Sequence, residues 1–277
     1  MPKPFGALIA ASCALTITAA TLLPGSASGA SAVSTLPTLN VAVAGKTGIA
    51  VSGSTVSGAV SIVSSFSGKG QGGYGLVRLN PGVSFPEALH AVQSHRGDPN
   101  ALTPFGSIVV AADAPGTVQT VLTPGSYVAL NLTGNGPAAN VAQFSVTQSS
   151  SPAALPAAAA TETSIEFGFK GPKVLRDGTM VRAENGGFLV HMDVLIGASS
   201  KHGAQKLAAL LKAGKDRQAN KLATGFADLI DSASPGAMQQ EVLNAKPGYY
   251  VQACFMDTQD GREHTQLGME RVIRIAK

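Results

Sequence analysis

The chain is poor in charged and aromatic side chains. Of its 277 residues, 13% are charged and 5% aromatic, and tryptophan is absent. The formal net charge of +4 is spread along the chain without a basic run or interleaved basic and aromatic residues, so we expect no nucleic acid partner. Glycine (32) and proline (16) are plentiful. This composition favours short strands joined by tight turns over long helices.

Long apolar runs are missing except near the N-terminus. Residues 5–23 are apolar, follow the basic Lys3 and precede a run of small residues. This order is typical of a secretory signal peptide, which we place at residues 1–32. A retained anchor is a weaker alternative, because serine and threonine interrupt the apolar run and Pro24 ends it. A lipid on Cys13 is also weaker, because Ala10 stands three residues before it, where leucine is usual, and the apolar segment before it is very short. We therefore expect a protein of the extracellular or periplasmic space, secreted or held in the cell envelope, with no integral membrane span in the mature chain.

Cysteine is nearly absent. The chain has two cysteines, and removal of the signal peptide would leave only Cys254. An unpaired cysteine is a liability in a secreted protein, because its thiol oxidises or forms a disulfide with a wrong partner. Its presence therefore suggests a specific role. Three readings are open for Cys254: an intermolecular disulfide, a buried thiol that packs as a small apolar group, or a metal thiolate.

The remaining sequence divides into two units. Residues 41–148 and 162–277 are rich in short β-branched segments bounded by glycine, proline, asparagine or serine, which predicts strands. Between them, the uncharged low-complexity segment 149–161 is expected to be an interdomain linker. The predicted strands are residues 41–44, 58–66, 75–79, 107–110, 118–122, 126–132 and 142–147 in the first unit, and 163–169, 179–184, 189–196, 239–243, 249–255 and 270–275 in the second.

Helical periodicity is confined to two places. In the first unit, Ser84 can cap a short helix over residues 85–93. In the second unit, the apolar period changes from 2 to 3.6 between Ser199 and Ile230. There we expect two apolar-faced helices, broken near Gly214, inserted into an otherwise all-β unit.

The two units are similar to one another in sequence. Residues 115–131 parallel residues 235–254, since each segment has Pro-Gly, a strand, a second Pro-Gly and an aromatic strand. A repeat near 120 residues predicts tandem domains. In this alignment Cys254 faces Asn131, and His191 faces Gly72. The first copy is therefore expected to be a degenerate one that keeps the scaffold but lacks the residues that could bind a metal.

The most informative stretch lies near the C-terminus. Nine residues separate Cys254 from His264, and four separate His264 from Met269, so one loop could close around one metal ion. His191, at the start of a predicted strand, is the best candidate for a second histidine. A thiolate, two imidazoles and a weak thioether are the ligand set that favours copper. Zinc would prefer more cysteine or histidine and no thioether, and a metal-free sandwich remains the alternative.

This pattern resembles the cupredoxins, the blue or type 1 copper proteins, in particular the secreted plastocyanin-like domains of bacteria. The similarity covers most of residues 162–277 and, more weakly, residues 41–148. Three features depart from the family: a longer loop between cysteine and histidine, the predicted helical insertion, and Met192-Asp193 after the first histidine. The residues that carry the resemblance are Glu184–His191, Pro247, Gly248, Tyr250, Cys254, His264, Gly268 and Met269.

The resemblance implies two tandem Greek-key β-sandwiches and a secreted, non-enzymatic carrier of single electrons. Cys254, His191 and His264 would bind copper in one plane, with Met269 as the axial ligand. His264, on the loop, would be the more exposed ligand and the exit point for the electron. We expect a monomer that exchanges electrons with a redox protein. The alternatives are a metal-free binding or cell-envelope module and a copper storage or delivery protein.

Overall fold

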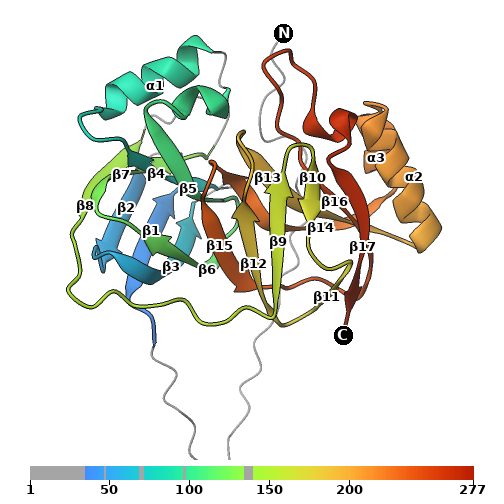
Figure 1. The fold of residues 1–277 in the computed structure, drawn as a ribbon, viewed down its shortest axis with the longest axis horizontal. Helices are drawn as coiled ribbons and strands as arrows, with labels where there is room; N and C mark the ends of the chain where they lie inside the picture. The colour runs from blue at the N-terminus through green and yellow to red at the C-terminus, as the bar shows by residue number, and fades with distance from the viewer. Residues whose placement is uncertain (1–34, 47, 69–71, 96–97, 134–139) are drawn as a thin grey trace, which may run out of the picture.

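The computed structural model describes residues 35–277, except for 47, 69–71, 96–97 and 134–139 (Figure 1). The predicted signal peptide lies outside the described residues. In the described part of the chain, no helix is both long and apolar enough to cross a membrane.

In its described residues, the first unit has eight strands, with one α-helix and one 3-10 helix between β4 and β5 (Figure 1). The helix α1 begins after Ser84, the cap residue that the sequence predicts, and Ser84 also forms a capping box with Glu87. The elements are β1 (Thr38–Ala44), β2 (Gly48–Gly53), β3 (Gly58–Ser67), β4 (Tyr74–Leu79), α1 (Phe85–Ser94), η1 (Pro99–Leu102), β5 (Gly106–Ala112), β6 (Gly116–Leu122), β7 (Gly125–Asn131) and β8 (Val141–Val146).

The second unit is also built mainly of strands, so the all-β class predicted from the sequence is confirmed. Its elements are β9 (Ala160–Ile165), β10 (Gly168–Lys170), β11 (Val174–Arg176), β12 (Met180–Asn185), β13 (His191–Ala198), α2 (Lys201–Lys212), α3 (Asp216–Asn220), β14 (Ala223–Ala233), β15 (Met238–Val242), β16 (Gly248–Ala253), η2 (His264–Leu267) and β17 (Glu270–Ala276).

One sheet runs through both units. Its eight strands lie in the order β10-β9-β12-β15-β6-β3-β1-β2, so β15 of the second unit continues the sheet from β6 of the first. Gln240 lies opposite Gln119 at this junction, and its side-chain Nε2 donates to Gln119 Oε1 at 2.9 Å. Two smaller sheets complete the described sandwiches, with orders β5-β4-β7-β8 and β11-β17-β16-β13-β14. The sandwiches therefore lie side by side on a shared sheet.

The two smaller sheets have the same pairing order. β4 pairs with β5 and β7, and β7 with β8; in the same way β13 pairs with β14 and β16, and β16 with β17. Tyr127 in β7 and Tyr250 in β16 each donate their hydroxyl to a carbonyl oxygen four residues earlier, that of Thr123 and of Lys246. The predicted repeat requires such correspondences, and the repeat itself stays a prediction.

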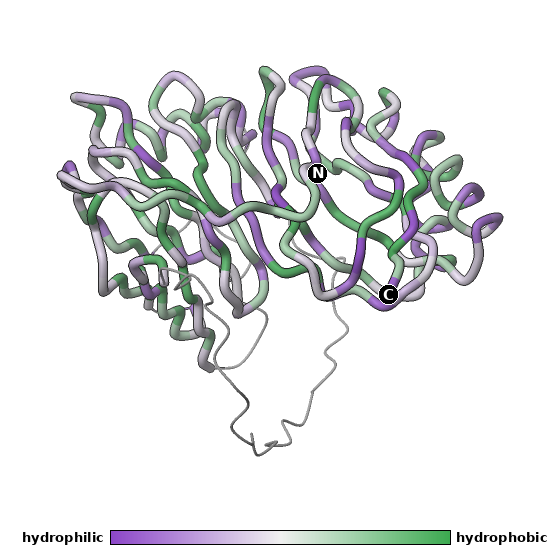
Figure 2. The backbone as a smooth tube through the Cα atoms, turned by 60° about the horizontal axis from the view of Figure 1, so that its bottom comes forward, coloured by the Kyte–Doolittle hydropathy of each residue, from purple (hydrophilic) through white to green (hydrophobic). Residues whose placement is uncertain are grey.

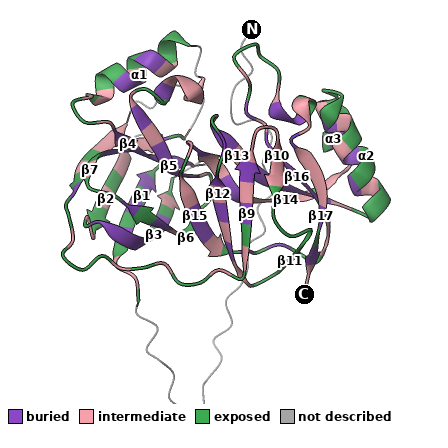
Figure 3. Cartoon of the chain, in the orientation of Figure 1, coloured by how far each residue is buried: buried purple, intermediate pink, exposed green. Residues whose placement is uncertain are grey.

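Each sandwich encloses its own apolar core. In β1 alternate residues are buried, because successive side chains of a strand point to opposite faces (Figure 3). Hydrophobic and hydrophilic stretches alternate along the backbone (Figure 2). Leu39, Val41 and Val43 thus join the first core, while Leu195 and Ile230 belong to the second. A further apolar cluster joins side chains of both units, and it contains Cys254 and Met269.

The helical insertion differs from the prediction. Helix α2 is confirmed and ends just before Gly214, whose φ of 65° suits a glycine. The second predicted helix is wrong, because residues 223–233 form the strand β14, which pairs with β13. Thr224, Gly225 and Phe226 are weak helix formers, so pairing with β13 overrides the apolar period. The short helix α3 is the one helix between α2 and β14.

Two boundaries also differ. The predicted strand over residues 163–169 is two antiparallel strands, β9 and β10, with a turn between them. The predicted linker 149–161 contacts both units, since Ala153 O accepts from Ala59 N and Ala159 N donates to Met180 O, each at 2.8 Å. Its last residues belong to β9.

Candidate metal centre

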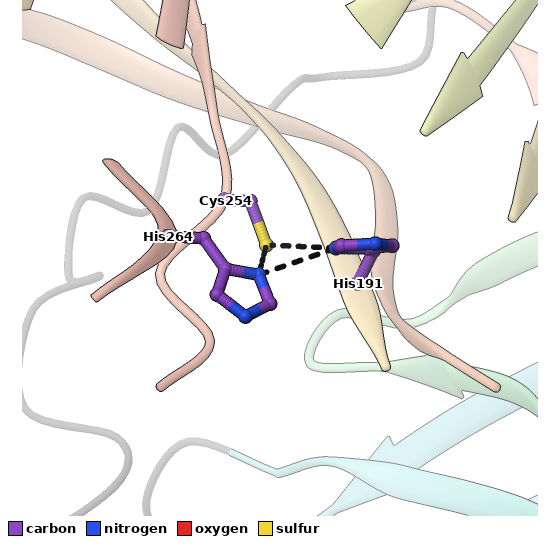
Figure 4. Close-up of side chains that lie close together, drawn as sticks. All are labelled: His191, Cys254 and His264. Atoms are coloured by element: carbon purple, nitrogen blue, oxygen red, sulfur yellow. Dashed lines mark hydrogen bonds between the residues drawn. The ribbon is translucent and has the colours of Figure 1, made fainter. Parts of the chain in front are cut away.

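Three side chains named from the sequence converge at one end of the second sandwich (Figure 4). His191 is the first residue of β13, Cys254 directly follows β16, and His264 begins η2. His191 Nδ1 lies 3.2 Å from His264 Nδ1, and Cys254 Sγ lies 3.3 Å from His264 Nδ1 and 3.8 Å from His191 Nδ1.

These distances fit three ligands around one metal ion. With metal–nitrogen bonds of about 2.0 Å and a metal–sulfur bond of about 2.3 Å, a planar trigonal site places the two nitrogens about 3.5 Å apart. The same site separates nitrogen and sulfur by about 3.7 Å. The observed triangle agrees to within about half an ångström, and its two imidazoles and one thiol are ligand types suited to copper.

Sheet pairing and loop hydrogen bonds bring the three residues together. β13 and β16 are antiparallel neighbours, with Val194 opposite Ala253, so the start of β13 lies beside the end of β16. The loop after Cys254 then turns back: His264 N donates to Met256 O at 2.8 Å, and Cys254 N donates to Met269 O at 3.2 Å. These two hydrogen bonds place the end of the loop beside its beginning, at the end of β16.

The candidate site is buried. His191 is 1% exposed, and Cys254 and His264 are 0% exposed. The expectation that His264 is the more exposed ligand is therefore wrong. The loop folds inward, and the Phe167 ring lies edge-on to the His264 imidazole with 5.0 Å between centroids. The length and polarity of a loop do not reveal which of its side chains point inward.

Met269 lies next to Cys254 through backbone pairing and belongs to the same apolar cluster. Its side chain is fully buried. Its role as an axial ligand stays a prediction.

Burial disfavours the charged form of both imidazoles. It lowers the pKa of His191, although the Glu166 carboxylate opposes this effect. Burial and then the charge of His191 lower the pKa of His264 to about 4. Neutral imidazoles offer the lone pair that a metal needs. Burial also raises the pKa of the Cys254 thiol to about 12, so a metal would have to displace its proton.

Glu166 contacts Nε2 of His191, the ring nitrogen that points away from Cys254 and His264, and the sequence did not indicate this residue. Its Oε1 lies 3.3 Å from His191 Nε2 and accepts hydrogen bonds from the backbone N–H groups of Phe188 and Leu189. A carboxylate on the second ring nitrogen fixes the orientation of a metal-binding histidine. Glu166 lies in the turn between β9 and β10, far from His191 in sequence, so no local signal marks it.

The turn before His191 is held from two directions. Asn185 Nδ2 donates to Leu189 O at 2.8 Å and to Ala233 O at 2.7 Å. From the first unit, Asn100 Oδ1 accepts a hydrogen bond from Val190 N. These bonds shape the segment between β12 and β13, and the contribution of the first unit was not foreseen from the sequence.

A buried polar network lies beside the site. Gln252 Nε2 donates to Asp193 Oδ2 at 2.7 Å and to Glu162 Oε2 at 3.2 Å, and Arg271 Nε donates to Gln252 Oε1 at 2.6 Å. Arg271 also pairs with Glu162. Asp193 and Gln252 each lie two residues from a candidate ligand, so the network holds the ends of β13 and β16 in register.

Comparisons with known proteins return weak likenesses. No protein-family model and no curated protein matches the chain. Among solved structures, the auracyanin of Roseiflexus castenholzii is 18% identical with a TM-score of 0.27, covering 42% of this chain and 95% of its own. A multicopper oxidase is 11% identical with a TM-score of 0.24, covering 86% of this chain and 88% of its own. Likenesses of this size assign no family. The strand arrangement by itself is consistent with the cupredoxin-like fold expected from the sequence.

Proposed function

We propose that the protein binds one copper ion through His191, Cys254 and His264, with Met269 as a weak axial ligand, and carries single electrons. The observation that carries this proposal is the triangle of ligand atoms, with sides of 3.2, 3.3 and 3.8 Å. It arises in one loop and one neighbouring strand, as the sequence spacing predicts.

The surroundings of the triangle support copper over other metals. One soft thiolate with two imidazoles suits both oxidation states of copper, whereas structural zinc sites hold four cysteine or histidine ligands. Bound copper would supply a one-electron couple. The protein would hold both rings through Glu166 and the loop hydrogen bonds, and it would keep water from the ligands.

Burial favours electron transfer over catalysis at this site. Catalytic metal sites keep a position open for water or substrate. Here the three ligand side chains are 0–1% exposed, and Cys254 lies in an apolar cluster with Val190 and Met256. The electron would therefore pass through the covering side chains to a redox protein, and the proposed protein is a carrier.

A metal-free module is the second candidate, and one observation favours it. The three side chains lie within hydrogen-bonding distance of one another, so the cluster satisfies part of its polar groups without a metal. Copper storage or delivery would use the same residues as electron transfer.

Addition of Cu(II) to the purified chain separates these possibilities. Copper bound to a thiolate gives an intense visible absorption at about 600 nm. We expect this band in the wild type, its loss in Cys254→Ser, and its retention in His202→Ala, which alters an exposed histidine on α2. Absence of the band from the wild type would exclude the copper site. A band without reversible reduction would favour storage over electron transfer.

A further inference from the structure

The helical insertion of the second unit carries an excess of positive charge. Residues 201–221, which span α2 and α3, contain six lysine and arginine residues and one acidic residue, Asp216. The whole chain has 20 Lys and Arg against 16 Asp and Glu, so the residues outside this segment carry a net charge of −1. The net positive charge of the protein therefore comes from the insertion. The six cations are Lys201, Lys206, Lys212, Lys215, Arg217 and Lys221.

Folding gathers these cations on the outside of the second sandwich. No two of the six are adjacent in sequence, so they form no basic run, but α2 and α3 pack against each other at one side of the molecule (Figures 1 and 3). All six residues are exposed, whereas Asp216 is partly buried. Even Lys212, whose Nζ lies 3.8 Å from Glu270 Oε1, keeps 61% of its side chain exposed. We call the exposed side of residues 201–221 the insertion surface.

The large apolar side chains of α2 face the protein. Ala204, Leu207 and Leu211 are 0–2% exposed and share an apolar cluster with Val251 and Ala253 of β16. A helix that lies in a membrane interface directs a broad apolar face toward the lipid, and α2 has already buried its own. The insertion surface therefore suits a hydrated anionic partner. The exposed residues of α2 are Lys201, His202, Gln205, Lys206, Ala209 and Lys212.

The insertion surface borders the candidate metal centre. Helix α2 contacts η2, which begins at His264. The contact lies near the C-terminal end of α2, because a Cβ atom at Gly268 would lie 3.9 Å from Lys212 Nζ. A molecule docked on the insertion surface would therefore lie beside the loop that holds His264.

We propose that the insertion surface docks an acidic electron-transfer protein, which exchanges electrons with the neighbouring metal centre. This role rests on the copper function proposed above. One electron passes between the bound copper and the redox group of the partner, so that one is oxidised as the other is reduced. Opposite charges on the two proteins raise their association rate and orient the encounter, and salt weakens both effects.

Binding of an acidic polypeptide tests the surface without copper. Labelled poly-L-glutamate is titrated with the copper-free chain, and fluorescence anisotropy gives Kd. We expect binding to the wild type that weakens as ionic strength rises from about 0.01 M to about 0.15 M. Lys201→Glu/Lys206→Glu reverses two exposed charges of α2 and should weaken binding about tenfold. Lys46→Glu/Lys173→Glu makes the same change in net charge at exposed positions outside the insertion, and it should weaken binding far less.

Small redox ions test whether the surface directs electron transfer. The reduced, copper-loaded chain gives one electron to anionic hexacyanoferrate(III) or to cationic tris(phenanthroline)cobalt(III), and stopped-flow absorption follows the copper band as it appears. The charge reversal on α2 should slow the first reaction about tenfold and accelerate the second. Equal changes with the two oxidants would contradict docking beside the metal centre.

The remaining outcomes separate this inference from its alternatives. A wild type that shows the copper band but does not bind poly-L-glutamate overturns the docking surface alone. A wild type that binds poly-L-glutamate but shows no copper band overturns the copper function and, with it, the electron-transfer partner. If the reversal variant does not fold, Lys201→Gln/Lys206→Gln replaces it and should lose part of the binding.

A membrane surface is tested in the same way. Vesicles of about three parts phosphatidylcholine to one part phosphatidylglycerol replace the polypeptide in a sedimentation assay. We expect weaker binding to these vesicles than to poly-L-glutamate at the same concentration of negative charge. Tighter binding to the vesicles that the reversal variant loses would identify a membrane as the partner and overturn the inference.

Discussion

Asn100 of the first unit accepts a hydrogen bond from the backbone N–H of Val190, with 2.7 Å between Oδ1 and N. Asn100 is itself held, because Asp98 Oδ1 accepts from its backbone N–H at 2.8 Å and from its Nδ2 at 2.9 Å. Val190 precedes His191 in the chain. The first unit thus supports one side of the candidate metal centre, although none of the proposed ligands comes from it.

Replacing Asn100 by alanine should loosen the segment before His191. The buried Val190 N–H would lose its acceptor, which costs about 1–3 kcal/mol of unfolding free energy. We expect lower stability in urea denaturation and a shifted or weakened copper band. Asn100→Asp keeps an acceptor oxygen for Val190 N but places a second carboxylate beside Asp98 Oδ1, so it should restore both properties only in part. Asn80→Ala removes an exposed hydrogen bond to Pro104 O and serves as the control. Unchanged stability and an unchanged band in Asn100→Ala would contradict this role.

Removing the Glu166 side chain should weaken metal binding. Its carboxylate faces His191 Nε2 and holds two backbone N–H groups of the adjacent turn. Loss of such a partner typically lowers metal affinity about 10–100-fold. Copper titration against a competing chelator should show this decrease in Glu166→Ala and a smaller one in Glu166→Gln, which keeps one acceptor. Equal affinities in all three proteins would rule out a positioning role for Glu166.

Gly187 is expected to tolerate no side chain. A Cβ atom there would lie 2.4 Å from Glu166 Oε1 and 2.7 Å from His191 Nε2, both too close. Gly187→Ala should therefore destabilise the protein by about 1–3 kcal/mol and disturb the copper band. Gly225→Ala is the matched control, since a Cβ at that position meets no atom within 4 Å. Thermal unfolding and absorption spectra of the two variants test the difference, and identical behaviour would show that the turn adjusts freely.

Arg271→Leu should destabilise the protein more at pH 8 than at pH 5. Burial raises the pKa of Glu162 from 4.5 to about 7, and the Arg271 charge opposes this rise. Because the folded pKa exceeds the unfolded one, Glu162 takes up a proton on folding, and its contribution to stability falls as pH rises from about 4.5 to 7. Above this range the ionised carboxylate depends on Arg271, and loss of a buried partner costs about 3–5 kcal/mol.

Urea denaturation at the two pH values measures this difference. Asp193 and Gln252 also face Glu162, and burial raises the pKa of Asp193 to about 7, so its contribution has the same sign. In Glu162→Gln/Arg271→Leu, the pH-dependent part due to Glu162 should disappear. Arg262→Leu, which breaks an exposed pair with Asp260, should leave stability almost unchanged. If Arg271→Leu lowers the free energy of unfolding equally at pH 5 and pH 8, the ionisation of Glu162 does not change between these pH values.

The sequence alone determined the all-β class, most strand positions and the three residues that converge. Their prediction was possible because strand patterns and turn residues are local, and because His191, Cys254 and His264 each lie at or beside a strand end or loop that the pattern marks. Cys254 is the only cysteine outside the predicted signal peptide, so it was the only candidate for a thiolate ligand. The strand β14 was missed because residues 222–230 carry an apolar spacing that fits a helix, and only pairing with β13 makes them extended.

The tertiary structure alone decided what surrounds those three residues. Glu166 and Asn100 reach the site across 25 and 90 residues of chain, so no local pattern could assign them. The inward turn of His264 depends on packing against Phe167, which lies almost a hundred residues earlier in the chain. The burial, the pKa values and the hydrogen-bond partners of these side chains depend on contacts between segments that are distant in sequence. Such contacts form only when the chain folds.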